Sequence, residues 1–264
     1  MATGRTLDRW KRVYVDGYDF SGQARKVGPL EITRDAADLT AIADPVRGYL
    51  PNHSHVNVGA INSVFDNTAT TGIHNRLVSA GVMRTVSVAQ GIRAAPAQGD
   101  PVFAGQFTQG EYAVAEDGGG VVVNLPFSGW AEDAESILFA SPWGVLLNAN
   151  TARTAVNAAA GVDLVNVTTA GGGYMVYHVT ASSNAVHTAT LLVQEADTNT
   201  DLSFAALSGA TTGVITVTAG VRGMVSISPT ATVKQFVRWQ IVLGTATSVT
   251  FVLSWHPGSY VTPP

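Results

Sequence analysis

The sequence contains no cysteine and few charged residues, and each shortage excludes a class of protein. Without cysteine the chain has neither disulfide bonds nor thiolate metal sites. Cysteine usage therefore does not indicate whether the protein lies in an oxidising or a reducing compartment. Lys, Arg, Asp and Glu together make up 13 % of the residues, about half the usual share of a globular domain. Thr, Ser, Asn, Ala and Gly therefore supply most of the surface, which suits β-sheets and burial against other subunits.

Long apolar runs and basic clusters are also missing. No run of about 18 apolar residues occurs, and the opening residues MATGRTLDRWKR lack the apolar core of a signal peptide. We therefore expect no membrane span and no ordinary secretion. The net charge is −4, and the densest basic group is Arg9, Lys11 and Arg12. This group is too small to hold nucleic acid tightly.

Short strand-like segments separated by Gly and Pro fill most of the 264 residues. Residues 12–20 place Val13 and Val15 on one face of an expected strand and Tyr14 on the other, with a turn or bulge signal at Asp16 and Gly17. The second half repeats strands at roughly ten-residue spacing, typical of a sandwich or jelly roll. The eight expected strands are Val162 to Val167, Tyr174 to Thr180, Thr188 to Gln194, Leu202 to Leu207, Val214 to Ala219, Met224 to Ser228, Phe236 to Leu243 and Val249 to Trp255.

One segment has a helical rather than a strand-like pattern. Leu39, Ile42 and Val46 recur at helical intervals after acidic residues, which predicts a helix over residues 35–47. Gly48 and Pro51 would end it, and alternation from His55 to Phe65 predicts a strand. A second, short helix is expected from Ile73 to Ala80.

The charge pattern changes in the middle of the chain. There are 26 charged residues before Thr151, and only 8 among the 114 residues from Thr151 to Pro264. We therefore predict a mainly β protein with a boundary near residues 150–160. Residues 1–150 would form a β-sandwich or barrel domain with the packed helix 35–47. Residues 151–264 would form a second β-sandwich, of the jelly-roll or immunoglobulin-like kind.

Two groups of residues have spacings that suggest metal ligands. His53 and His55 would point the same way in a strand, but no third ligand lies nearby, so we interpret them as surface histidines. Asp197, Asn199 and Asp201 match the first positions of a calcium loop. The later positions that need Gly and Glu hold other residues, so a polar hairpin tip is the better interpretation.

No constellation of residues predicts catalysis or a cofactor. The acids Asp16, Asp19, Glu31, Asp35 and Asp38 could in principle supply a carboxylate pair, but the spacing brings no two of them together. No strand-turn-helix setting for a nucleophilic serine occurs. We therefore expect no catalytic, cofactor-binding or metal site.

Two stretches resemble known bacteriophage proteins. The block LTAIADPVRGYLPNHSHVNVGAINSVFDN, followed by a strand and VVVNLPFSGW, resembles the tail tube proteins of long-tailed bacteriophages. The matching positions are Tyr49-Leu50-Pro51, Phe65-Asp66, Phe127 and Gly129-Trp130. The chain departs from the family at Asn52, where Gly is common, and at Asn62-Ser63-Val64.

The second stretch, TATLLVQEADTNTDLSFAAL with KQFVRWQIVLGTATSVTFVLSW, resembles a β-sandwich module of phage structural proteins. Gln194, Asp197, Leu207 and Arg238 fall on its recurring positions, whereas Ala196 replaces a Ser. Such modules are appended to capsid, tube and fibre proteins alike.

The tail tube resemblance implies a structural virion protein made in the host cytoplasm. Its rings, hexameric in that family, would stack into a siphovirus-like tail tube, with a tape measure protein and a tail terminator as partners. Double-stranded DNA would pass through during ejection without tight binding. We predict a subunit interface at the break in the chain that includes Tyr49, Leu50, Pro51, His53 and His55.

Two other functions are kept open. The chain could be a capsid decoration or host-surface carbohydrate-binding protein, with Trp239, Trp255 and Tyr260 as a stacking platform for sugars. A hydrolase is the third possibility, although no residue pattern indicates its substrate.

Overall fold

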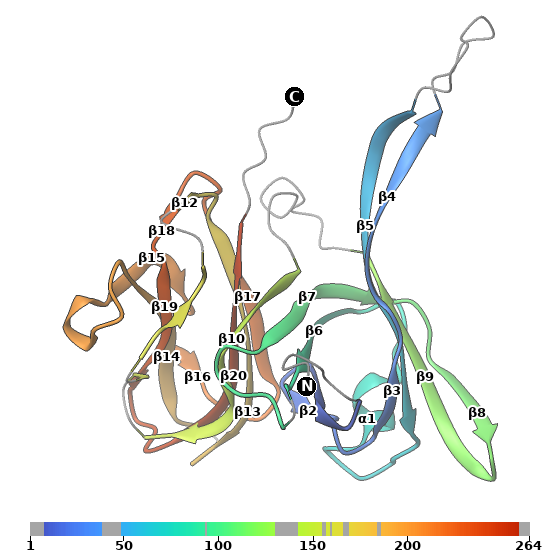
Figure 1. The fold of residues 1–264 in the computed structure, drawn as a ribbon. Helices are drawn as coiled ribbons and strands as arrows, with labels where there is room; N and C mark the ends of the chain where they lie inside the picture. The colour runs from blue at the N-terminus through green and yellow to red at the C-terminus, as the bar shows by residue number, and fades with distance from the viewer. Residues whose placement is uncertain are drawn as a thin grey trace, which may run out of the picture. The chain divides into compact units, whose positions relative to one another are not determined.

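The structure is a computed structural model that describes residues 8–38, 49–92, 94–129, 142–154, 157–158, 160–165, 169–183 and 186–258. For residues 34–38, 49–55 and 169–170 the description covers the backbone only. The protein is mainly β and its sheets are antiparallel, as the sequence predicts (Figure 1). Among the described residues, no helix is long and apolar enough to cross a lipid bilayer.

The described elements of the first half of the chain are η1 (Asp8–Trp10), β1 (Lys11–Val15), β2 (Tyr18–Asp19), β3 (Ala24–Val27), β4 (Leu30–Asp38), β5 (Tyr49–Val64), α1 (Ile73–Leu77), β6 (Met83–Gln90), β7 (Pro101–Gln109), β8 (Ala113–Asp117) and β9 (Gly120–Ser128). Those of the second half are β10 (Trp143–Arg153), β11 (Val162–Asp163), β12 (Thr169–Ala170), β13 (Gly173–Ser182), β14 (Thr188–Ala196), η2 (Asp201–Ser203), β15 (Ala205–Thr211), β16 (Ile215–Thr216), β17 (Val221–Ile227), β18 (Thr232–Val233), β19 (Phe236–Leu243) and β20 (Val249–Pro257).

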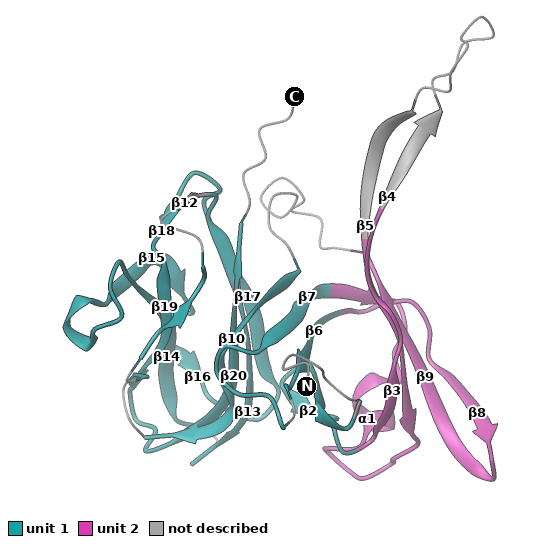
Figure 2. Ribbon diagram, in the orientation of Figure 1, with its two compact units in different colours: residues 1–22, 84–106, 133–264 teal, residues 23–83, 107–132 magenta. Residues whose placement is uncertain are grey.

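The chain divides into two compact units (Figure 2). Unit 1 comprises residues 1–22, 84–106 and 133–264, and unit 2 comprises residues 23–83 and 107–132. The expected domain boundary near residue 150 does not coincide with a limit of either unit. It falls inside β10, which pairs with β7 through Val145 and with β20 as far as Arg153. The change in charge therefore does not mark a break in the sheet.

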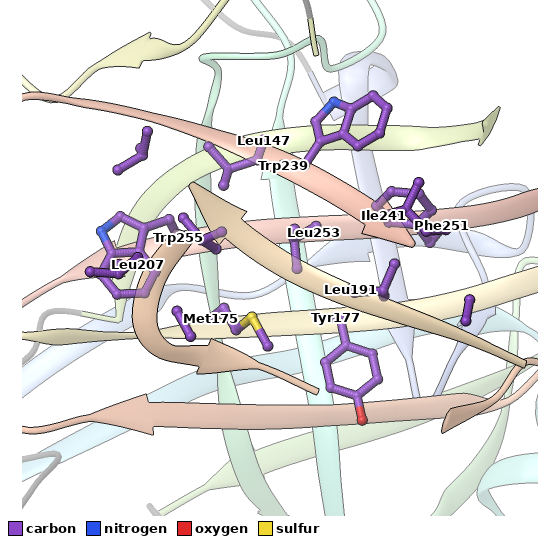
Figure 3. Close-up of a cluster of buried hydrophobic side chains, with 14 of the residues drawn as sticks. Leu147, Met175, Tyr177, Leu191, Leu207, Trp239, Ile241, Phe251, Leu253 and Trp255 are labelled. Carbon is purple, nitrogen blue, oxygen red and sulfur yellow. The ribbon is translucent and has the colours of Figure 1, made fainter. Parts of the chain in front are cut away.

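Unit 1 contains a β-sandwich. One layer belongs to a sheet with the strand order β17-β13-β20-β10-β7-β6-β1-β2, and the other is the five-stranded sheet β11-β19-β14-β15 with β16 beside β14. Residues from both layers form one buried core, among them Met175 and Phe251 from the first, and Leu191 and Trp239 from the second (Figure 3). Burying each such side chain contributes about 1.5–3 kcal/mol.

Strands β13 and β20 are buried on both faces. Met175 and Tyr177 face the sandwich core, whereas Tyr174 and His178 point to the other side, where the Tyr174 hydroxyl donates to the Ala104 carbonyl at 2.9 Å. Strands covered on both faces have near-continuous apolar sequences. This explains why GYMVYHV and FVLSW show little polar alternation.

The two ends of the long strand path approach each other. β2 contacts β13, and the Gly17 amide in the β1–β2 turn donates to Nδ1 of His178 on β13 at 3.1 Å. The sheet of unit 1 therefore curls back on itself, and a cluster of polar groups lies where its ends meet.

Unit 2 is built around the long strand β5. β3 and β4 pair with one edge of β5, β9 pairs with part of the other edge, and β8 extends the sheet beyond β9. The short helix α1 buries Ile73 and Leu77, and the buried side chain of Gln109 donates to the Leu77 carbonyl at 2.7 Å. The sequence prediction of a helix from Ile73 is confirmed, although the helix ends at Leu77.

The predicted helix over residues 35–47 is wrong where it can be compared. Residues 35–38 belong to β4, and Ala36, Ala37 and Asp38 lie opposite Pro51, Leu50 and Tyr49 of β5. Cross-strand pairing has overridden the helical spacing here. The rest of the predicted helix, residues 39–47, lies outside the described residues.

Candidate assembly surface

The five predicted interface residues all lie in the first half of β5. Tyr49, Leu50 and Pro51 pair in register with the end of β4, and His55 lies opposite Thr33. The sequence predicted a break in the chain at this place, whereas the structure has a continuous strand from Tyr49 to Val64. The region is the outer part of a two-stranded β4–β5 ribbon.

One edge of this ribbon has no partner strand in the described part of the chain. β9 pairs with β5 from Val64 back to Asn57, where Ser128 ends the ladder. Within the described residues, β5 pairs from Tyr49 to Val56 with β4 alone. Pro51 lies opposite Ala36 next to a register shift of the β4–β5 ladder, a place where a residue without a backbone N–H is tolerated.

An apolar stripe follows one face of the ribbon. The opposed pairs are Leu30 with Val58 and Ile32 with Val56. Val58 is buried within unit 2, whereas Ile32 is 46 % exposed. The apolar face of the sheet thus continues onto the ribbon, where its side chains are more exposed. Exposed apolar surface of this kind is common at sites that bind another protein.

The sheet edges formed by β8, β4 and the outer half of β5 differ in charge. β8 is an edge strand that ends in Glu116 and Asp117, and β4 carries Glu31, Arg34, Asp35 and Asp38. Charged side chains on an edge strand oppose pairing with another chain. The β5 edge, residues 49–56 with the sequence YLPNHSHV, has no Asp, Glu, Lys or Arg. It is the edge best suited to accept a further strand.

No three His, Cys, Asp or Glu side chains gather among the described residues, and the side chains of His53 and His55 lie outside that description. The Asp197 carboxylate pairs with the Lys234 ammonium at 2.9 Å. The Asn199 side chain binds the backbone of Gly161, and Asp201 pairs with Arg238. The calcium-like spacing is therefore explained by a loop whose acids bind cationic side chains.

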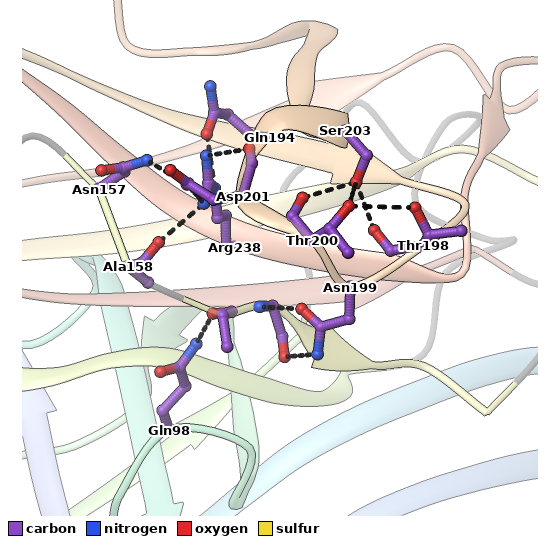
Figure 4. Close-up of polar contacts among 12 residues, drawn as sticks. Gln98, Asn157, Ala158, Gln194, Thr198, Asn199, Thr200, Asp201, Ser203 and Arg238 are labelled. Atoms are coloured by element: carbon purple, nitrogen blue, oxygen red, sulfur yellow. Dashed lines mark hydrogen bonds and ion pairs between the residues drawn. The ribbon is translucent and has the colours of Figure 1, made fainter.

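Arg238 organises that loop (Figure 4). Its guanidinium is buried and donates to Gln194 Oε1 at 2.7 Å and to the Ala158 carbonyl at 2.9 Å, besides pairing with Asp201. It also lies over the Phe204 ring, 4.2 Å from its centroid. The motif residues Gln194 and Arg238 are direct cross-strand partners, so this part of the phage-module pattern has a structural role.

Among the candidate carboxylates, the side chains of Asp16, Asp19 and Glu31 are described. Asp16 is buried between Arg84 and Arg222. The Asp19 carboxylate accepts hydrogen bonds from the backbone of Ser21 and the side chain of Asn150. Glu31 is exposed, and for Asp35 and Asp38 only the backbone is described. Each of the two described Asp side chains is thus engaged by its own partners.

The structure also reveals a serine–histidine pair that the sequence analysis missed. Ser87 Oγ lies 2.8 Å from His178 Nε2, and both side chains are fully buried. The other ring nitrogen accepts from a backbone amide rather than facing a carboxylate. No local motif could have found this pair, because 91 residues separate its members.

The sugar-binding platform is wrong in two of its three residues. Trp239 is 2 % exposed and Trp255 is fully buried, both within the sandwich core. Neither indole can stack on a sugar, because neither ring reaches the surface. Tyr260 lies outside the described residues.

Comparisons with known proteins add little. No protein-family model matches the chain, and no curated protein matches it. Among solved structures, it is similar to the SPP1 Dit (gp 19.1) protein, described as a paradigm of the hub adsorption apparatus in Gram-positive infecting phages. The identity is 12 % and the TM-score 0.31, over 93 % of this chain and 98 % of that chain. No function follows from a likeness this low.

Proposed function

We propose that this chain is a structural subunit of the tail of a long-tailed bacteriophage, of the tail tube type. The observation that carries the proposal is the β5 edge from Tyr49 to Val56, which carries no charged residue and has no partner strand within the described residues, beside a half-exposed apolar stripe. The same residues belong to the segment whose sequence resembles tail tube proteins.

Physical chemistry supports assembly through this edge. A two-stranded ribbon is only marginally stable alone, and its outer N–H and C=O groups gain partners when another copy supplies a strand. Each added hydrogen bond contributes on the order of 1 kcal/mol. An interface between unlike surfaces of successive copies closes into a ring if the rotation between them permits.

The proposed role is mechanical and requires no catalytic residue or cofactor. Stacked rings, six-fold by analogy with the family, would enclose a channel for double-stranded DNA. A tape measure protein and a tail terminator would be the partners within the virion. A net charge of −4 agrees with a conduit that does not retain phosphates, although the charge of the whole chain does not define one surface.

The test is to purify the full chain, concentrate it and examine it by negative-stain electron microscopy and sedimentation velocity. We expect rings or short tubes as wide as a phage tail. Leu50→Asp should abolish them, because it places a charge in the unpaired edge. Leu202→Asp is the matched control, since Leu202 is 100 % exposed on the η2 turn of unit 1.

Three outcomes would contradict the proposal. The first is a chain that remains monomeric at every concentration. The second is a Leu50→Asp variant that still forms rings. The third is equal loss of rings in both variants, because a general effect of surface charge would then explain the result.

A further inference from the structure

The β1–β2 hairpin is held by an unusually dense set of polar contacts at its turn. Asp16 and Gly17 both have positive φ, 51° and 80°, as a two-residue hairpin turn of type I′ requires. Asp16 is 5 % exposed. Its carboxylate accepts from Arg84 at 2.9 Å, from Arg222 at 3.1 Å and from the Thr85 amide at 3.0 Å.

His178 connects this turn to the strands behind it. Its Nδ1 accepts the Gly17 amide proton, so in the neutral ring the hydrogen lies on Nε2 and is donated to Ser87 Oγ. One imidazole thus joins the turn, β6 and β13. All these residues belong to unit 1.

The surroundings of His178 disfavour its protonated form. Burial, together with the positive charge of Arg222, lowers its pKa to about 3. The other charged or titratable groups of the cluster are Asp16 in the turn, Arg84 on β6 and Tyr14 on β1, whose ring centroid is 6.0 Å away. Burial and Asp19 raise the pKa of the Tyr14 phenol, so this group stays neutral in acid.

We propose that the β1–β2 hairpin is a latch that protonation of His178 releases in acid. A proton on Nδ1 removes the lone pair that accepts the Gly17 amide, and it adds a positive charge that Arg222 repels. Both changes favour a state in which the turn has left His178. Release unpairs β1 from β6 and exposes Val13, Val15 and the edge of β6.

The direction of the pH dependence follows from proton linkage. A freed imidazole has a pKa near 6.5, so the open state binds a proton more readily than the closed state. The closed state is therefore most favoured above pH 6.5. The open fraction rises by up to about tenfold for each pH unit between 6.5 and 3.

The absence of cysteine allows a direct test by thiol labelling. Val15→Cys places one thiol on β1, at a site that is 1 % exposed. The rate of labelling by 4,4′-dithiodipyridine, a reagent that reacts with thiols in acid, is measured from pH 7 to pH 4. Each rate is divided by the rate for a cysteine peptide at the same pH. Leu191→Cys, buried in the sandwich core, reports unfolding of the whole unit.

We expect the corrected labelling of Val15→Cys to rise at least tenfold by pH 4, while Leu191→Cys stays protected. Adding His178→Asn to the Val15→Cys variant should remove the rise in labelling, because the amide oxygen can replace Nδ1 as acceptor and does not titrate. His178→Gln is the second variant if the first does not fold. Adding Asp16→Asn should leave a rise, because His178 still titrates.

Several outcomes would overturn the latch. One is labelling of Val15→Cys that does not change with pH. Another is parallel exposure of Leu191→Cys, which would mean global unfolding. A rise that persists in both His178 variants, or that disappears with Asp16→Asn alone, would assign the response to a different group.

Discussion

At the scale of single residues, Arg238 shows how one side chain can hold irregular segments on a sheet. It lies on β19 and bonds to Gln194 on the neighbouring strand, to Ala158 before β11 and to Asp201 in η2. The sandwich module has few other charges to do this. The residue is therefore a point at which stability and loop geometry can be tested together.

We predict that Arg238→Ala lowers the free energy of unfolding by about 3 kcal/mol, because it leaves buried acceptors without a donor and opens a cavity. Urea unfolding followed by tryptophan fluorescence measures the change. Lys234→Ala is the control, since the Lys234–Asp197 pair is exposed and such pairs contribute little. Equal effects of the two substitutions would contradict this role of Arg238.

At the scale of elements, two hairpin turns of the same kind differ in what surrounds them. Gly17 in the β1–β2 turn and Gly118 in the β8–β9 turn both have positive φ, 80° and 60°. A Cβ at Gly17 would lie 2.6 Å from the backbone of Gly220, whereas a Cβ at Gly118 would have no neighbour within 4 Å. Substitutions at these two glycines therefore separate the cost of the backbone conformation from the cost of close packing.

We predict that Gly118→Ala costs about 1–2 kcal/mol, the cost of a left-handed conformation for an alanine. Gly17→Ala should cost about 1–3 kcal/mol more, because the backbone must also move apart. Thermal and urea unfolding of the two variants give the comparison. Identical losses of stability would show that the contact with Gly220 imposes no additional constraint.

Two edge strands of unit 2 also differ, in this case in the charge of their side chains. β8 and the outer half of β5 both pair on one side only within the described residues. They differ because β8 ends in Glu116 and Asp117, whereas residues 49–56 of β5 carry no charged side chain. Charge thus distinguishes an edge protected against pairing from one suited to it.

At the scale of the whole molecule, charge is scarce, at 13 % of the residues, and in the second half it is used internally. Of the eight charged residues from Thr151 onward, all have a hydrogen-bonding or ionic partner within the chain. Little charge remains to drive association through this part. Residues 49–56 of the β5 edge carry no charged side chain either, so assembly by backbone pairing there should depend weakly on salt.

We predict that rings of the purified protein persist in 1 M NaCl, where the Debye length falls to about 3 Å. Sedimentation velocity at 0.05 M and 1 M NaCl measures the ring fraction, and Leu50→Asp provides the monomer reference. Dissociation of the rings by salt would assign the interface to charged surfaces and away from the unpaired edge.

The linear sequence predicted several features that depend on neighbouring residues. Alternation and Gly-rich turns predicted the mainly β class, and the strands containing Val13, Tyr177 and Leu191 were recognised. Asp16 and Gly17 were recognised as a turn or bulge, and Ile73 as the start of a helix. These features follow local rules of backbone geometry and side-chain period, which a short window of sequence contains.

Tertiary structure alone decided what depends on residues distant in the chain. It made Asp35–Asp38 a strand, because residues 49–51 pair with them. It buried Trp239 and Trp255, and it joined Asp16 to Arg222 across 206 positions. Spacing along the chain does not specify which strands become neighbours, so neither the unpaired edge of β5 nor the His178 cluster could be located from it.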